Sequence, residues 1–184
     1  MDSITYAKRI QSAILSSAKL VKEYLKESFI LYQPKDVVAG DFYRVESVAN
    51  PVLSEVGLTG QNQEPLFMFA AADCSGHGVS GAMVSVVCNN ALNRSVREYG
   101  LTDPGQLLDK TRAIVVAEFE KSEEEVKEGM DIALCSLSGN QLQYAGANHP
   151  LWMVRNGELL ETKANKQAIG HFDHPKPYTT HRFV

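Results

Sequence analysis

The chain has 184 residues, of which 44% are hydrophobic and 22% charged, and its formal net charge is −4. This is the composition of a folded globular domain with a core of its own, and it excludes a disordered chain. The acidic balance excludes a general nucleic-acid binder, which would need a basic face, so proteins are the expected partners.

The cysteines and the hydrophobic runs indicate the compartment. Cys74, Cys88 and Cys135 show no Cys-x-x-Cys spacing. We interpret them as reduced thiols rather than a zinc site or a disulfide framework, which predicts a cytoplasmic protein. The sequence has no signal-peptide pattern and no run of about 18 apolar residues, so we expect neither export nor direct membrane insertion.

Residues 1–28 are predicted to form an N-terminal helix. From Asp2 to about Lys26, a seam of mostly apolar and small residues recurs at spacings of three and four. Its positions are Ile4, Ala7, Gln11, Ile14, Ala18, Val21 and Leu25. Two interpretations stay open: an amphipathic helix packed on its own domain, or a weak coiled coil that forms a homodimer and transmits a signal from an upstream sensor.

Residues 65–82 carry the strongest functional signal. The apolar run 65–72 predicts a buried strand, so the carboxylate of Asp73 emerges at its C-terminal end. Gly76 and Gly78 allow a tight turn, and the spacing from Val79 to Tyr99 predicts a helix whose N-terminus points back at Asp73. A divalent cation there would create a phosphate site. The alternative is a glycine-rich turn with a capping acid.

Two further carboxylates stand beside predicted strands. Asp41 follows Gly40 and precedes an alternating strand, and Asp131 begins an apolar strand that runs to Leu137. Oxygen ligands at strand ends suit Mg²⁺, Mn²⁺ or Ca²⁺ better than zinc. For Asp131, a strand-capping residue that faces solvent remains the alternative.

The rest of the pattern alternates between helix and short strands. A hairpin loop is predicted over 48–64, a second helix from an N-cap at Asp103 to about Ser122, and a solvated acidic loop over 123–128. Strands are predicted at 141–147, 151–155 and 158–160, with a turn at Asn156-Gly157, and a last strand within 176–184. Helices flanking antiparallel strands predict an α+β domain.

Four motifs occur in an order that resembles the SpoIIE-type, RsbU-like branch of the PPM, or protein phosphatase 2C-like, metal-dependent phosphatases. They are Gly40-Asp41-Phe42-Tyr43, Ala72-Asp73-Cys74-Ser75-Gly76-His77-Gly78, Gly129-Met130-Asp131, and the stretch Leu142-Gln143-Tyr144-Ala145-Gly146-Ala147-Asn148-His149-Pro150. The resemblance covers residues 29–184. It implies an α-β-β-α sandwich of two antiparallel sheets flanked by helices, preceded by the N-terminal helix.

The resemblance also implies a serine/threonine phosphatase of bacterial signalling, in which two Mn²⁺ or Mg²⁺ ions activate a water. Asp73 matches the acid that bridges both ions, the backbone carbonyl of Cys74 matches a ligand of the second ion, and Asp41 matches an acid that holds that ion through water. Asp131 is expected to be a supporting acid. The loop Gly76, His77 and Gly78 is expected at the phosphate, with His77 and His149 fixing the backbone rather than binding metal.

In relatives the substrate is a phosphoprotein, typically an anti-sigma-factor antagonist. The family pattern continues past the equivalent of Val184 to further acidic turns, so the resemblance implies a domain that lacks its C-terminal strands and binds its first ion weakly. A second function class therefore stays open, namely a catalytically impaired module that binds a phosphoprotein or a regulator.

Overall fold

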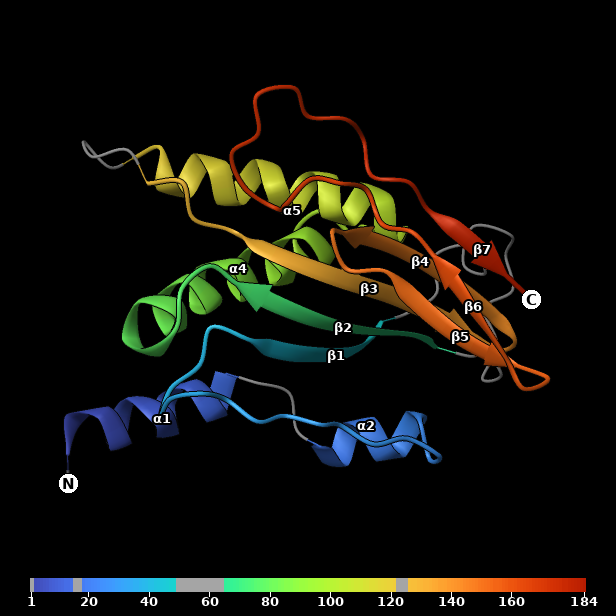
Figure 1. The fold of residues 1–184 in the computed structure, drawn as a ribbon, viewed down its shortest axis with the longest axis horizontal. Coiled ribbons are helices and arrows are strands. Elements are labelled where there is room, and N and C mark those ends of the chain that lie inside the picture. The colour runs from blue at the N-terminus through green and yellow to red at the C-terminus, as the bar shows by residue number, and fades with distance from the viewer. Residues whose placement is uncertain (1, 15–17, 49–64, 122–125) are drawn as a thin grey trace.

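A five-stranded antiparallel sheet, in the order β1-β2-β3-β4-β7, forms the centre of the computed structural model, which describes residues 2–14, 18–48, 65–121 and 126–184. Its strands are β1 (Phe42–Val48), β2 (Leu66–Cys74), β3 (Met130–Ser138), β4 (Gln141–Ala147) and β7 (His181–Phe183). A separate hairpin of β5 (Leu151–Arg155) and β6 (Glu158–Thr162) forms a second antiparallel sheet (Figure 1). The predicted mixed fold with two antiparallel sheets is confirmed.

Two helices, α4 (Gly78–Arg97) and α5 (Pro104–Phe119), cover one face of the five-stranded sheet (Figure 1). Side chains of a strand alternate between faces, and Met68, Ala70 and Ala72 of β2 all point into the core beneath these helices. Leu92 of α4 and Leu108 of α5 are fully buried there. This layer is the main hydrophobic core.

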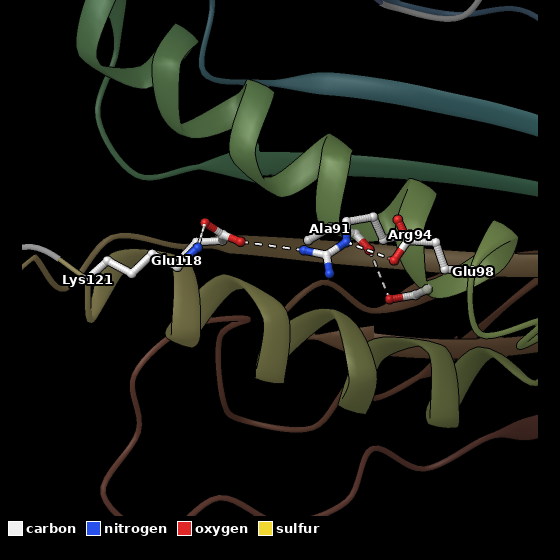
Figure 2. A network of polar contacts seen from close by, with 6 residues as sticks. Ala91, Arg94, Glu98, Glu118 and Lys121 are labelled. Atoms are coloured by element: carbon white, nitrogen blue, oxygen red, sulfur yellow. Dashed lines mark hydrogen bonds and ion pairs between the residues drawn. The ribbon is translucent and has the colours of Figure 1, made fainter.

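The two helices are also joined by polar contacts, shown in Figure 2. Arg94 of α4 reaches Glu98 at 3.1 Å and Glu118 of α5 at 3.4 Å, and Lys121 lies 2.6 Å from Glu118. Ion pairs on a surface contribute little stability each. The helix pair is therefore held chiefly by its buried contacts.

The predicted start of α5 is confirmed. The Asp103 side chain accepts hydrogen bonds from the backbone N–H groups of Gly105 and Gln106, and Pro104 occupies the first turn. An acidic N-cap satisfies donors that the helix leaves unpaired, and proline there loses no hydrogen bond. The Oγ atom of Thr180 donates to the same carboxylate at 2.6 Å, which ties the segment before β7 to this helix.

The N-terminal residues form two helices, α1 (Ser3–Ile14) and α2 (Ala18–Tyr24), instead of one long helix, and residues 15–17 lie outside the described part. Val21 of α2 packs against Val45 and Phe67 on the sheet face opposite α4 and α5. The ring of Tyr24 stacks on Phe67 with centroids 4.7 Å apart. For α2, these contacts agree with the interpretation of an amphipathic segment packed on its own domain.

Most other sequence predictions match the elements found. The helix expected over 79–99 is α4, and the predicted Asn156-Gly157 turn has φ values of 55° and 80°. Only His181–Phe183 of the last predicted strand is a strand. The predicted hairpin loop over 48–64 and the acidic cluster fall largely on residues 49–64 and 122–125, outside the described residues. No described helix is long and apolar enough to cross a membrane.

We expect Leu108→Ala to lower the free energy of unfolding by about 2–5 kcal/mol, because it removes a fully buried side chain and leaves a cavity under α5. The matched control is Leu159→Ala in β6, where the side chain is 61% exposed and the change should stay within about 0.5 kcal/mol. Urea unfolding measures both. Similar losses at the two positions would contradict this placement of the core.

Candidate metal site

Packing of backbone against backbone brings the two acidic segments together. A Cβ atom on Gly40 would lie 2.7 Å from the carbonyl oxygen of Gly76, and one on Gly81 would lie 2.6 Å from the same oxygen. Real Cβ atoms do not approach so closely, so only glycine fits at either position. Gly76 itself has φ +79°, which also favours glycine. Asp41 therefore directly follows a residue that is pressed against the loop after Asp73.

The carboxyl groups of Asp41 and Asp73 meet at this point. Both side chains line the same cavity, and the pKa of Asp41 is raised, first by desolvation and then by the proximity and charge of Asp73. The charge of His149 acts in the opposite direction. Two neighbouring carboxylates favour a shared proton or a bound cation, because either one relieves the repulsion between them. The pair supplies the hard oxygen donors that Mg²⁺ and Mn²⁺ prefer.

Asp131 lies across from Asp73 in the antiparallel register of β2 and β3. Its Oδ1 atom accepts a hydrogen bond from Nδ2 of Asn148 at 2.8 Å, and Asn148 adopts φ +57° in the turn after β4. Asp131, Asp73 and Cys74 line a cavity of about 330 Å³. Within the described ranges, however, no three His, Cys, Asp or Glu side chains form a metal-binding group. The predicted supporting role of Asp131 stays a prediction.

The carbonyl group predicted as a backbone ligand belongs to Cys74 and faces the Asp41 segment, since it would lie 3.2 Å from a Cβ atom on Gly40. The Cys74 thiol points the other way, into the core. Contact with Cys88 and burial raise the pKa of that thiol. All three cysteines are free and buried.

Ser75 fastens the loop after Asp73 to the start of β3. Its Oγ atom accepts from the N–H group of Gly129 at 2.8 Å and donates to the carbonyl oxygen of Gly129 at 3.0 Å, while its own N–H group donates to that oxygen at 2.9 Å. These bonds align the strand end that carries Asp131 with Asp73. The sequence analysis did not identify this role of Ser75.

His77 lies at the N-cap position of α4 and makes no capping hydrogen bond with its side chain. Instead its Nδ1 atom lies 2.9 Å from Oδ2 of Asp36, with both side chains partly exposed. The pair connects the segment before Asp41 to the glycine loop. The backbone of His149 accepts a hydrogen bond from the Tyr144 hydroxyl group at 2.6 Å. The contact of the His77 ring is compatible with its predicted role in fixing the backbone, and the role of the His149 side chain stays a prediction.

Two further residues hold the Asp41 segment, and sequence reasoning missed both. Nε2 of Gln11 donates to the carbonyl oxygen of Ala39 at 2.6 Å and to Oγ of Ser85 at 3.2 Å, and Oε1 accepts from the N–H group of Ala39 at 3.1 Å. The Tyr32 hydroxyl group donates to the carbonyl oxygen of Asp41 at 3.1 Å. The available signal for Gln11 was a polar residue within an otherwise mostly apolar seam.

Comparison with solved structures identifies the class of fold to which the chain belongs. The SiaA-PP2C domain of Pseudomonas aeruginosa is 29% identical with a TM-score of 0.77, over 99% of this chain and 65% of that one. The phosphatase domain of SpoIIE from Bacillus subtilis, solved with a fragment of its regulatory domain, is 14% identical with a TM-score of 0.55, over 79% of this chain and 37% of that one. The protein therefore has a PP2C-type phosphatase fold.

The family follows from the sequence. A family model described as Stage II sporulation protein E (SpoIIE) matches residues 64–184, and the chain belongs to this family. The RsbU and RsbW domains of a Mycobacterium tuberculosis protein are also similar, at 18% identity and a TM-score of 0.53 over 83% of this chain and 37% of that one. The chain spans 65% of the SiaA-PP2C domain. No curated protein matches it.

We expect Gln11→Met to lower the free energy of unfolding by about 1–3 kcal/mol, because it leaves the buried N–H and C=O groups of Ala39 without partners. Ser12→Ala, at an exposed position of the same helix, should change it by less than about 0.5 kcal/mol. Chemical denaturation compares the two variants. If Gln11→Met behaves like Ser12→Ala, the hydrogen bonds to Ala39 do not stabilise the segment.

We expect Asp41→Asn to stabilise the metal-free protein at neutral pH. Because the folded-state pKa of Asp41 is raised, its stabilising contribution is present below the ordinary carboxyl range and is lost as the pH rises through the raised pKa. The asparagine has no charge to be desolvated or to repel Asp73, so this loss should disappear. Thermal unfolding of both proteins from acidic to neutral pH, with a chelator present, measures it. Parallel curves would contradict the repulsion.

Proposed function

We propose that the protein is a metal-dependent serine/threonine phosphatase of bacterial signalling. The observation that carries this proposal is the placement of Asp41 and Asp73 at adjoining ends of β1 and β2, where both line the same cavity. A carboxyl group whose pKa is raised by a neighbouring carboxylate, as that of Asp41 is, is characteristic of sites that bind a cation or a proton. In a PP2C-type fold, the cation is the expected occupant.

The chain's own groups have distinct tasks in this proposal. Asp73, the carbonyl group of Cys74 and Asp41 would hold Mn²⁺ or Mg²⁺, with Asp131 as a supporting acid. Bound ions would lower the pKa of a water and neutralise phosphoryl oxygens, which allows hydrolysis without a protein nucleophile. The loop of Gly76, His77 and Gly78 leads into α4, whose N-terminal amide groups favour an anion and would orient the phosphate.

The partners follow from the same proposal. The substrate would be a phosphoprotein, with an anti-sigma-factor antagonist as the first to test, and an upstream sensor would control the activity. Among the similar structures, one contains RsbU and RsbW domains together and another contains a phosphatase domain with part of its regulatory domain. Homodimerisation through the N-terminal helices and a cytoplasmic location complete the proposal.

A second candidate is a module that binds a phosphoprotein or a regulator without hydrolysing it. In its favour, the described residues contain no cluster of three or more potential metal ligands. A hard cation at such a site would keep more of its water and bind less tightly. Hydrolysis separates the two candidates, because binding alone releases no phosphate.

We expect Mn²⁺-dependent hydrolysis of p-nitrophenyl phosphate and a loss larger than about 100-fold in Asp73→Asn, since outer-shell partners of a metal typically contribute about 10–100-fold. Asp131→Asn, which retains a hydrogen-bonding group toward Asn148, should lose less. Initial rates across a Mn²⁺ titration measure both. Absence of metal-dependent turnover in the unmodified chain would favour the binding module.

A further inference from the structure

The cavity of about 330 Å³ beside the candidate metal site has a lining that the proposed function has not used in full. Asp73 and Asp131, which are register partners on β2 and β3, form one part of it. The other walls come from residues 127–129, just before β3, and from a segment far along the chain that includes Gly170 and His171. The cavity therefore lies where three distant segments meet, at the ends of the strands.

Backbone hydrogen bonds fix the wall that carries His171. The N–H group of Met130 donates to the carbonyl oxygen of Ile169 at 3.0 Å, and the N–H group of Ile169 donates back to the carbonyl oxygen of Met130 at 2.8 Å. On the other side of this segment, the hydroxyl group of Tyr178 donates to the carbonyl oxygen of Ala168 at 2.8 Å. The backbone around the cavity is thus held in place, as a binding site requires.

The cavity offers hydrogen-bond donors as well as carboxylates. Among the described residues that line it, Lys127 carries a permanent positive charge and His171 adds an imidazole ring. Both residues are exposed. An ammonium group has three N–H donors, and an imidazole ring has at least one. Because phosphoryl oxygens are strong acceptors, a phosphate monoester matches donors of this kind better than a neutral ligand does.

The charged lining also distinguishes this cavity from the apolar face of the sheet. Packed protein readily covers an apolar surface, whereas covering Asp73, Asp131 and Lys127 would remove their hydration. Burial of a charge is costly unless the charge gains a partner. An anionic ligand, held at the edge of the proposed cation site, gives Lys127 such a partner.

We infer that Lys127 and His171 bind the phosphoryl group of the substrate in this cavity. The inference rests on the proposed phosphatase function and adds two substrate-binding residues to it. Asp73 lies where the cavity adjoins the proposed cation site, and the N–H groups of Lys127 and His171 donate to phosphoryl oxygens from the other walls. A phosphate monoester and released phosphate both accept these bonds, so the bonds contribute to affinity rather than to the rate of the chemical step.

Binding of inorganic phosphate tests this inference without catalysis. Isothermal titration calorimetry in the presence of Mg²⁺ compares the unmodified chain with Lys127→Met, which keeps the length of the side chain and removes its charge. We expect binding to weaken by about tenfold, the effect of losing one hydrogen bond between charged groups. Lys127→Arg should retain most of the affinity. Lys121→Met, at an exposed lysine that pairs with Glu118 outside the cavity, is the matched control and should bind like the unmodified chain.

The histidine has a matched control in the same loop. His171→Ala should weaken phosphate binding, whereas His174→Ala, at an exposed histidine outside the lining, should not.

Salt dependence and kinetics give readouts that a purely structural role would not change. Phosphate affinity of the unmodified chain should fall as NaCl is added, and it should fall less in Lys127→Met, because one screened charge has been removed. With p-nitrophenyl phosphate, the same variant should raise KM by about tenfold and leave kcat nearly unchanged, as loss of uniform binding predicts.

The outcomes separate the inference from the proposed function. If Lys127→Met and His171→Ala bind phosphate as the unmodified chain does, or if the unmodified chain binds no phosphate, the inference is overturned. Hydrolysis of p-nitrophenyl phosphate with an unchanged KM in both variants would also overturn it and would leave the phosphatase proposal intact. Phosphate binding that Lys127→Met weakens, in a chain that hydrolyses nothing, supports the inference, and the phosphatase proposal alone then fails.

Discussion

The proximity of two carboxyl side chains, Asp41 and Asp73, is the constraint on which the arrangement of the site depends. Neighbouring carboxylates repel each other when both are charged, which disfavours the folded state. Other contacts must therefore hold the two segments together. The packing of Gly40 against the Gly76 carbonyl group does this without side chains, and Gln11 and Tyr32 fix the backbone on either side. These contacts hold the two acidic segments in place against the repulsion between the carboxylates. Such preorganisation is what a cation site requires.

The two faces of the central sheet are covered to different extents. One face is covered by α4 and α5 and provides most of the buried apolar area. The opposite face is covered only in part by α2, which leaves the large cavity beside the carboxylates. The small β5-β6 sheet exposes Trp152, Val154 and Leu159, so it adds little to the core. Most of the core therefore lies on one face of the sheet and the large cavity on the other.

The features predicted from sequence are those that depend on local pattern. The strand before Asp73, the helix after it and the Asn156-Gly157 turn each follow from spacing within about a dozen residues. The contacts of Gln11 with Ala39 and of Ser75 with Gly129 join distant segments, and a single sequence does not show which segments meet. The N-terminal seam predicted helix but not the break into α1 and α2, and Gln11 and Val21 of the seam are buried whereas Ala7 and Ile14 are exposed. Periodicity alone does not identify the surface on which a helix packs.

The register of the sheet has a consequence for the order in which the chain folds. Strands β1 and β2 follow one another along the chain and bring Asp41 and Asp73 together, whereas Asp131 joins them only after α4 and α5 have been passed. Contacts between distant residues form more slowly, because more chain entropy is lost when they close. The carboxylate pair can therefore assemble on the nascent chain before the rest of the sheet.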